Sequence, residues 1–318
     1  MDLSIIIVNY KTKDLLDECL ESVVKNIKQV KFELIVIDNN SQDGSVQMLK
    51  EKYPQVILIK NQNNLGFAKA CNQGIKRSCG KYLFFLNPDT LIDSNIFANI
   101  IEFLEANPKV GVGGCFLYYP DRSPQASFYR FPTILTSIGK MFSLFRILPR
   151  NIITSAFFED YSFNNISNDI DRACGAAMIV RRKAIEQAGG FDEDYFMYNE
   201  ELDLCYRIKE RGWEISPIPE TKVIHYHQQG GQQNAGLTTF HKIKTELLFF
   251  KKFHSWYKVL IIRMIQFLGI LFRVLFWLIK YLLVKKQKRL NRGKLCSYLK
   301  LLFSNLDYSK SLFNMEVR

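Results

Sequence analysis

The stretch YLFFLNPD, residues 82–89, joins an unbroken apolar run to a carboxylate across a proline turn. The run has the composition of a strand that is buried on both faces of a sheet. A carboxylate at the end of such a strand is costly to bury unless something uses it. Because ligands bind at the carboxyl ends of the strands in a parallel α/β sheet, the stretch predicts such a sheet with a ligand site at Asp89.

Strand-like and helix-like segments alternate on either side of this stretch. Apolar runs predict strands over Leu3–Val8, Phe32–Ile37, Gln55–Ile59, Lys81–Leu86 and Val110–Leu117. Helices are predicted between them, over about residues 15–27, 41–52, 67–77 and 93–105. Later segments predict a strand at Arg172–Val180, a helix at Asn199–Arg211 and short strands near Glu214–Ile218 and Val223–Tyr226. The alternation predicts an α/β fold, a mostly parallel sheet with flanking helices.

An irregular insertion runs from Tyr119 to about Ile170 and is broken by prolines at positions 120, 124, 132 and 149. Its apolar stretch Ile134–Leu148 predicts a mobile or membrane-touching helix. A long irregular insertion in an enzyme is often a lid or a loop on the acceptor side, with plain disorder as the alternative.

The net charge of +12 suggests a nucleic-acid partner until it is mapped along the chain. Residues 251–318 hold fifteen Lys or Arg and two acids, whereas residues 1–250 hold twenty-eight Lys or Arg and twenty-nine acids. The basic charge therefore belongs to the C-terminal tail, which has no recognised nucleic-acid motif. We expect no nucleic-acid partner.

The tail is apolar as well as basic. Val259–Val284 is a run of 26 mostly apolar residues, long enough to span a membrane. Arg263, Arg273 and Lys280 interrupt it near one helical face, which favours a helix lying in the membrane interface over a true span or a buried oligomer helix. A basic cluster that would attract anionic lipid follows, at positions 285, 286, 288, 289, 292 and 294. We predict two domains, residues 1–250 with the ligand site and residues 251–318 for association with an anionic membrane surface.

The seven cysteines are scattered, odd in number and without C-x-x-C spacing. They indicate a reducing compartment rather than a disulfide scaffold or a zinc site. The first residues run directly into a strand-like segment, so no signal peptide is expected. Together with the tail, these features predict a location at the cytoplasmic face of a membrane.

Two segments of the N-terminal half carry candidate binding residues. Asp38 ends the second predicted strand, where its carboxylate can accept a hydrogen bond from a base or a ribose, with a helix cap as the equal alternative. Gly66, within Asn64–Phe67, allows close backbone approach at a helix start, where N–H groups can face a phosphate. The second signal is weak alone, because such turns are common.

Asp89 is the candidate metal ligand. It can bind Mg²⁺ or Mn²⁺, which bridges diphosphate oxygens, and a turn or cap is the alternative role. His225 or His227 could complete the site. A lone histidine is more often structural, so one of the pair is expected to be a bystander.

Glu200, Glu201 and Asp203 fall in one predicted helical turn. Acids at a helix start are favoured by the helix dipole, so an ordinary solvated role outweighs a catalytic one on this evidence alone. Asp203 and Arg207 are also spaced for an i,i+4 ion pair.

The ordered series of motifs is far more specific than any one of them. In chain order it comprises Val8-Asn9-Tyr10, Asp38-Asn39-Asn40-Ser41, NLGFAxAxNxG over residues 64–74, Asn87-Pro88-Asp89, Cys174-Gly175-Ala176-Ala177, FDExYFMYxEExDLCxR over 191–207, Arg211-x-Trp213 and His225. Over about residues 3–230 the series resembles the family 2 glycosyltransferases of the GT-A fold, most closely their rhamnosyltransferase-type branch.

The resemblance implies an inverting transferase that uses a nucleotide-diphosphate sugar and a divalent cation. It places the metal on Asp89 and His225, and the catalytic base in the segment Glu200, Glu201 and Asp203. The nucleotide-sugar contacts that it implies are Val8, Asn9, Tyr10, Asp38 at the base, Asn40, Asn64, Gly66, Phe67, Asn72 and Asn87.

Two positions depart from the family pattern. Asn87 replaces the first Asp of the D-x-D motif, which leaves one charge fewer for the metal. Glu201 stands where the family has its catalytic Asp and adds about 1.5 Å of reach, so Asp203 is the runner-up base.

The chain has no Q-x-x-R-W motif and no series of spans, which favours transfer of a single sugar over processive synthesis. Rhamnose is the donor sugar by analogy with the branch. The acceptor would be a glycan or a polyprenyl-diphosphate-linked glycan in cell-surface polysaccharide synthesis. The alternative is a membrane-associated protein that binds nucleotide-sugars but is catalytically impaired.

Overall fold

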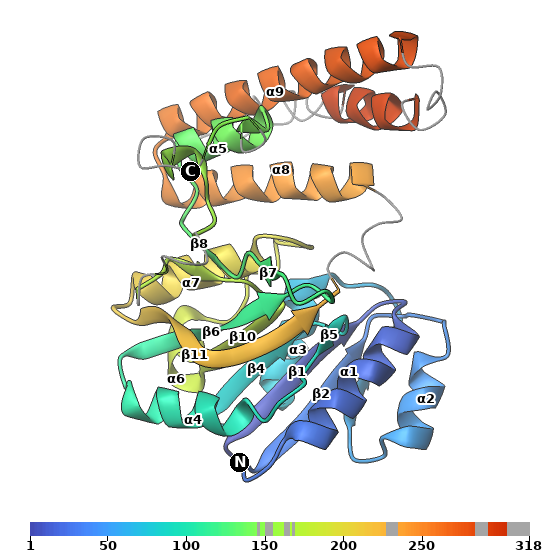
Figure 1. The fold of residues 1–318 in the computed structure, drawn as a ribbon, viewed down its shortest axis with the longest axis vertical. Helices are drawn as coiled ribbons and strands as arrows, with labels where there is room; N and C mark the ends of the chain where they lie inside the picture. The colour runs from blue at the N-terminus through green and yellow to red at the C-terminus, as the bar shows by residue number, and fades with distance from the viewer. Residues whose placement is uncertain are drawn as a thin grey trace. The chain divides into compact units, whose positions relative to one another are not determined.

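The computed structural model describes residues 1–144, 147–149, 155–161, 166, 169–226, 235–283 and 292–303. The chain divides into two compact units (Figure 1). The sheet unit comprises Met1–Phe131 and Asp160–Gln232, and the helical unit comprises Pro132–Glu159 and Gln233–Arg318. The predicted boundary after residue 250 lies inside the helix α8 (Ala235–Phe253), so these units divide the chain differently from the predicted domains.

The sheet unit is built on one large sheet of order β3-β2-β1-β4-β10-β6-β11-β5, with β7 paired to β6. Its strands are β1 (Leu3–Asn9), β2 (Phe32–Asp38), β3 (Ile57–Lys60), β4 (Tyr82–Leu86), β5 (Thr90–Leu91), β6 (Val110–Tyr118), β7 (Pro124–Gln125), β10 (Ala177–Arg181) and β11 (Glu214–His225). The first four strands run parallel, as do β6 and β11, whereas β10 and β5 are antiparallel to their neighbours. The predicted mostly parallel sheet is confirmed.

Helices cover both faces of this sheet, as predicted. They are α1 (Lys13–Asn26), α2 (Ser45–Lys52), α3 (Phe67–Arg77), α4 (Phe97–Ala106), α6 (Arg182–Ala188) and α7 (Glu200–Lys209). On one face, the apolar sides of α1, α2 and α4 join the inward side chains of the strands in a single core. On the other, α3 contacts β1 and β2, and α6 and α7 contact β6. All residues of β1 are buried, because helices cover both of its faces, so polar and apolar side chains do not alternate along this strand.

The order of the strands creates a switch point at β1. The chain winds outward from β1 through β2 to β3, and then crosses back to place β4 on the other side of β1. Crevices of this kind, at the carboxyl ends of the strands, are where α/β sheets bind ligands. Asn9 and Asp38 end β1 and β2 in register at this edge.

The predicted strand Arg172–Val180 is divided in the structure. β9 (Arg172–Ala173) pairs antiparallel with β8 (Phe128–Tyr129), and Cys174–Ala176 separates it from β10. Cys174 N donates to the Ser127 carbonyl at 2.8 Å. The first part of the irregular insertion is therefore ordered as part of the sheet unit. The two short strands predicted near residues 214–226 are one strand, β11, with a register shift between Pro217 and Lys222.

The helical unit contains α5 (Ile134–Met141), the short 3₁₀ helix η2 (Ser155–Phe157), α8, α9 (Trp256–Leu283) and a further helix within residues 292–303. The first helix ends at Met141, short of the predicted Leu148. It packs closely on α9, because a Cβ at Gly269 would lie 2.7 Å from Met141 Cβ.

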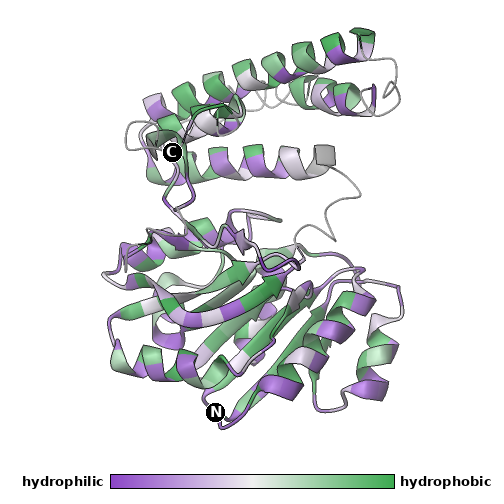
Figure 2. Cartoon of the chain, in the orientation of Figure 1, coloured by the Kyte–Doolittle hydropathy of each residue, from purple (hydrophilic) through white to green (hydrophobic). Residues whose placement is uncertain are grey.

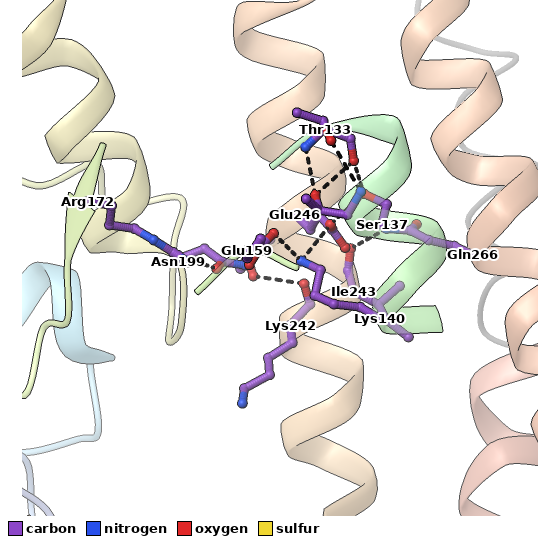
Figure 3. Close-up of polar contacts among 12 residues, drawn as sticks. Thr133, Ser137, Lys140, Glu159, Arg172, Asn199, Lys242, Ile243, Glu246 and Gln266 are labelled. Carbon is purple, nitrogen blue, oxygen red and sulfur yellow. Dashed lines mark hydrogen bonds and ion pairs between the residues drawn. The ribbon is translucent and has the colours of Figure 1, made fainter. Parts of the chain in front are cut away.

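A buried polar cluster holds α5 within the helical unit (Figure 3). Lys140 Nζ lies 2.6 Å from a Glu159 oxygen and 2.8 Å from a Glu246 oxygen. Ser137 Oγ donates to Glu246 at 2.9 Å. Because Glu246 is only 4% exposed, its carboxylate needs these partners.

The long helix α9 has two different faces. One is packed within the helical unit and carries Ile262, Ile265, Gln266, Gly269, Ile270 and Val274. Figure 2 colours most of the helix as hydrophobic. The other face exposes apolar side chains; the most exposed are Trp256, Tyr257, Leu260, Met264, Leu268, Leu275, Ile279, Leu282 and Leu283. By length and composition α9 could cross a membrane. Arg273, predicted on a polar stripe, instead donates to the Lys140 carbonyl at 2.8 Å. Positions 285, 286, 288 and 289 of the basic cluster lie outside the described residues.

Candidate active site

Asp89 and His225 face each other across the pairing of β5 with β11. Residue 225 is the register partner of Thr90, and Tyr226 N donates to the Asp89 carbonyl at 2.9 Å. This pairing brings His225 Nε2 to 3.3 Å from Asp89 Oδ1. Both residues are buried, at 6% and 8% exposure. Two segments more than a hundred residues apart thus meet, whereas His227 lies outside the described residues.

The pair Asp89 and His225 fits a divalent cation. Carboxylate oxygen and imidazole nitrogen are both ligands of Mn²⁺ and related ions. Two ligands at right angles on an octahedral ion of this size would lie about 3 Å apart, close to the observed separation. The described residues contain no group of three His, Cys, Asp or Glu side chains that could hold a metal. Two protein ligands leave room for the diphosphate oxygens and waters that such ions retain.

Asn87, in the first position of the D-x-D motif, is held by its backbone. Its N–H donates to the Ala176 carbonyl at 2.9 Å, and its carbonyl accepts from Thr90 Oγ1 at 2.7 Å. These bonds fix the turn that presents Asp89 at the end of β4.

The three acids of α7 occupy three different environments. Asp203 is fully buried, accepts from Arg207 Nε at 2.5 Å and is hydrogen-bonded to Tyr195. Arg207 Nη2 also donates to the Gly190 carbonyl at 2.9 Å. Burial raises the pKa of Asp203, and the Arg207 charge opposes the rise. Asp203 therefore ties α7 to the end of α6, which is a structural role.

Glu200 is buried beside Glu201. Its Oε2 has no hydrogen-bond partner among the described residues. Burial, and then the neighbouring charge of Glu201, raise the pKa of Glu200 well above its usual value. Glu200 is thus buried away from an acceptor, and its neighbour Glu201 is the better candidate for a base.

Glu201 points toward a part of the chain that the sequence did not indicate. Its Oε1 lies 3.3 Å from Arg172 Nη1, and the Arg172 guanidinium stacks 4.6 Å from the centre of the Tyr129 ring. The same Nη1 donates to Asn199 Oδ1 at 3.4 Å (Figure 3). Tyr129 and Arg172 are cross-strand partners in the β8–β9 pair. The small second sheet therefore supplies a buried cation that holds the Glu201 carboxylate.

The segment Cys174–Ala176 links Glu201 to the metal pair. A Cβ at Gly175 would lie 3.6 Å from Glu201 Cβ, and the Ala176 carbonyl bonds the turn before Asp89. Burial raises the pKa of the Cys174 thiol to about 11, and the carboxylates of Glu201 and Asp89 add to the rise. The candidate base and the candidate metal pair therefore flank one backbone segment.

Asp38 braces the wall of the predicted nucleotide pocket. Its Oδ1 accepts from Asn9 Nδ2 at 2.9 Å and its Oδ2 from Ser41 N at 3.1 Å. The side chain is 1% exposed, so both oxygens serve the protein, and a base contact stays a prediction. Asn9 also bonds Ser41 Oγ at 2.9 Å, which joins the loops after β1 and β2.

Other predicted nucleotide contacts lie on the same two loops. Val8 and Asn9 are buried at the end of β1, whereas Tyr10 is 40% exposed and open to a ligand. Asn40 adopts a left-handed backbone conformation, with φ of 65°, and its Oδ1 accepts from Gln42. The structure thus brings these residues together at one edge of the sheet.

Gly66 is required by a close backbone approach. It has φ of 86°, and a Cβ there would lie 2.5 Å from the Phe196 carbonyl oxygen. Phe67 N donates to that same oxygen at 2.8 Å, and Gly66 N donates to Asn64 Oδ1 at 3.0 Å. The start of α3 therefore serves as the seat for the loop that leads into the acids of α7.

Asn72 supports this loop from below. Its Nδ2 donates to the Phe191 carbonyl at 2.8 Å, and its Oδ1 accepts from Phe191 N at 2.9 Å. Both ends of the Asn72 amide bond the backbone of this loop, and its predicted contact with the nucleotide-sugar stays a prediction.

Sequence reasoning missed Gln125 as well as Arg172. Gln125 is 4% exposed, and its Oε1 lies 2.7 Å from His225 Nδ1. Both residues lie in short strands within or just after the irregular insertion, where the sequence shows no periodicity. Their only signal is a polar residue next to an aromatic or apolar one, which is too common to select them.

The sheet topology, with its switch point at β1, is that of the GT-A fold. Residues 4–189 match the sequence profile of Glycosyl transferase family 2. The match covers more than half of the chain, so the protein belongs to this family, as its ordered motifs predicted.

The relatives point to the rhamnosyltransferase branch. N-acetylglucosaminyl-diphospho-decaprenol L-rhamnosyltransferase of Mycobacterium tuberculosis is 28% identical over 238 residues, which cover 71% of this chain and 76% of the relative. Rhamnosyltransferase WbbL of Escherichia coli K12 is 24% identical over 230 residues, 70% of this chain and 82% of the relative.

The solved structure of mannosyltransferase PcManGT from Pyrobaculum calidifontis, in complex with GDP-Man and Mn²⁺, shares the fold. Its TM-score is 0.57 at 15% identity, and the match covers 96% of this chain and 86% of that one. The predicted GT-A fold and rhamnosyltransferase-like character are confirmed.

Proposed function

We propose that this glycosyltransferase moves one sugar from a nucleoside-diphosphate donor to an acceptor hydroxyl, with inversion at the anomeric carbon. The observation that carries the proposal is the position of Glu201 and of the Asp89–His225 pair on either side of Cys174–Ala176. A base and a leaving-group site that flank one segment can act on the same donor in a single displacement.

Glu201 is the proposed general base. It is partly exposed, at 16% of its side chain, and its carboxylate is held by Arg172. It takes the proton of the acceptor hydroxyl as that oxygen attacks the anomeric carbon. Glu200 is buried, and Asp203 is fully buried in its ion pair with Arg207, so an acceptor hydroxyl would reach Glu201 more easily than either of them.

Asp89 and His225 are the proposed ligands of Mg²⁺ or Mn²⁺. When bound, such an ion neutralises the charge that develops on the departing nucleoside diphosphate. The protein's own part is to hold a carboxylate and an imidazole 3.3 Å apart in a buried site, with Asn87 fixing the turn.

The names of the relatives support the donor and acceptor that we propose. Two similar proteins are named rhamnosyltransferases, and the mycobacterial one acts on a decaprenol-diphosphate-linked sugar by its name. We therefore assign rhamnose as the sugar. The acceptor is assigned as a glycan or polyprenyl-diphosphate-linked glycan in cell-surface polysaccharide synthesis.

The proposed location is the cytoplasmic face of a membrane, where such lipid-linked acceptors would be met. Support comes from the exposed apolar face of α9, whose side chains include Leu268 and Leu275, each 50% exposed. An amphipathic helix with a basic tail binds anionic membrane surfaces by this combination.

A donor screen tests the proposal. Purified full-length protein is incubated with Mn²⁺, a lipid-linked acceptor and a panel of nucleoside-diphosphate sugars that includes thymidine-diphosphate rhamnose. We expect transfer from one donor, with a product whose anomeric configuration is inverted by NMR. Retention of configuration would overturn the mechanism. Donor binding without transfer would favour the catalytically impaired alternative.

A further inference from the structure

We infer that Gln125 is a positioning residue that fixes the ring of His225 with Nε2 directed toward Asp89, and thereby strengthens divalent-cation binding at this pair. The inference rests on the metal role proposed for Asp89 and His225. It goes beyond that role by naming the group that sets the histidine tautomer.

The orientation of the Gln125 amide follows from two contacts. Gln125 Nε2 lies 3.4 Å from the His225 carbonyl oxygen, which can only accept a hydrogen bond. The amide nitrogen must therefore be the atom that faces this carbonyl. Consequently the other end, Oε1, faces His225 Nδ1 at 2.7 Å.

The tautomer of His225 follows in turn. An amide oxygen only accepts, so the hydrogen of this bond belongs to Nδ1 of His225. In the neutral ring, Nε2 then carries the lone pair, and Nε2 is the nitrogen 3.3 Å from Asp89 Oδ1. A histidine that binds a metal through one nitrogen usually donates the other N–H to an oxygen in this way, which fixes its orientation.

Gln125 is itself held rigidly. It ends the short strand β7, where it is the register partner of Leu117 on β6. The Gln125 carbonyl accepts a hydrogen bond from Ser127 Oγ at 2.8 Å. The same Ser127 Oγ accepts one from Leu117 N at 2.8 Å. With the residue only 4% exposed, the amide has little freedom to release His225.

Two substitutions separate positioning from packing. Gln125→Met keeps the length of the side chain and removes the acceptor, whereas Gln125→Glu keeps an acceptor for Nδ1–H. Gln266→Met is the matched control, because Gln266 is 1% exposed and bonds the Ile243 carbonyl within the helical unit. Mn²⁺ alone is titrated against each variant by water-proton relaxation, and thermal melting reports folding.

We expect Gln125→Met to weaken Mn²⁺ binding by about 10–100-fold, with Gln125→Glu and Gln266→Met near the wild type. Wild-type affinity in Gln125→Met would overturn the inference. Asp89→Asn and His225→Ala identify which proposal has failed. If these two also bind Mn²⁺ normally, the metal site itself is wrong. If they lose binding while Gln125→Met keeps it, only the role of Gln125 is wrong.

A spectroscopic measurement on the unaltered protein does not depend on the folding of any variant. The chain has four histidines, so the ring nitrogens of His225 can be assigned in ¹⁵N NMR by comparison with His225→Ala. With saturating Mg²⁺, we expect the ring hydrogen of His225 on Nδ1, because Nε2 would then give its lone pair to the ion. A hydrogen on Nε2 would overturn the inference.

Discussion

Three carboxylates in the first turn of α7 show how strongly neighbours decide what a residue can do. Glu200 is buried with one carboxyl oxygen unpaired among the described residues, Glu201 is held at the edge of the site by Arg172, and Asp203 is buried in an ion pair with Arg207. The motif predicts that acids stand here. The family pattern ranks Glu201 ahead of Asp203. It could not predict their surroundings, because these depend on side chains from β9 and from the far end of α7.

Loss of the Asp203 charge should lower the stability of the fold, because Asp203 has a structural role. Asp203→Asn leaves the Arg207 guanidinium without its anion, and breaking a buried pair in this way costs about 3–5 kcal/mol of unfolding free energy. Urea denaturation measures the loss. Glu186→Gln is the control, because its i,i+4 pair with Arg182 is exposed and worth about 0.5 kcal/mol. Equal stability of the two variants would contradict the structural role.

The stability contributed by Glu200 should depend on pH. Its pKa is raised in the folded state, so the folded protein holds the proton more tightly than the unfolded chain does. Stability is therefore greatest below the ordinary pKa of glutamate, and is lost as the pH rises toward the raised value.

Replacement of Glu200 by Gln removes that loss. Glu200→Gln should be more stable than the wild type at pH 8, and the difference should vanish at about pH 4, near the unfolded pKa. Each unit of upward shift corresponds to about 1.4 kcal/mol. Denaturation at a series of pH values measures it. If the difference in unfolding free energy between the two proteins is the same at all pH values, folding does not raise the pKa of Glu200.

At the scale of elements, the start of α3 and the loop before α7 contact each other and act as one structural unit. The Phe196 carbonyl rests on Gly66, Asn72 holds Phe191, and two residues before α7, Tyr198 and Asn199, adopt left-handed conformations with φ of 68° and 66°. Strain of this kind persists where the surrounding structure fixes it, often at functional sites. This structural unit sets the position of the acids.

A methyl group at Gly66 should disturb this structural unit. Gly66→Ala should destabilise the fold by roughly 1–3 kcal/mol more than Gly189→Ala, because the added Cβ overlaps the Phe196 carbonyl. Gly189 is the matched control, since it also has positive φ but has nothing within 4 Å of the added atom. Thermal melts and transfer rates measure both. If the two variants lose equal stability, the contact with Phe196 is not important.

Most elements of the sheet and the parallel direction of its first four strands could be predicted from the sequence, but the antiparallel strands could not. Buried apolar runs and helical stripes are local patterns, so β1, β2 and β4 were predicted within a residue or two. The antiparallel direction of β10 and the pairing of β8 with β9 depend on how the chain returns from the insertion. Asp89 and His225 lie in motifs, so the sequence predicted them. Gln125 and Arg172 lie in short strands within or just after the insertion, and only the structure shows that they reach the site.

At the scale of the whole molecule, the chain joins a catalytic sheet unit to a helical unit with an exposed apolar face. Arg273 of α9 donates a hydrogen bond to α5. The basic residues of this helix are therefore not all available to contact a membrane surface. The exposed face is free of acidic residues within the described part of α9. We predict that this unit contacts lipid.

Charges placed on that face should abolish membrane binding without unfolding the protein. We expect wild-type protein to float with phosphatidylglycerol vesicles, and Leu268→Glu combined with Leu275→Glu to remain in the soluble fraction. Val24→Glu is the control, because Val24 is a 41% exposed apolar residue of α1 in the other unit. Equal flotation of all three proteins would exclude α9 as the membrane contact.

The rate of sugar transfer by Glu201→Gln tests the central claim most directly. The substitution keeps the shape of the side chain and removes its basicity, so kcat should fall by about 10²–10⁴-fold while Mn²⁺ affinity and melting temperature stay at wild-type values. Transfer by Glu201→Gln at the wild-type rate would contradict the assignment of Glu201 as the base.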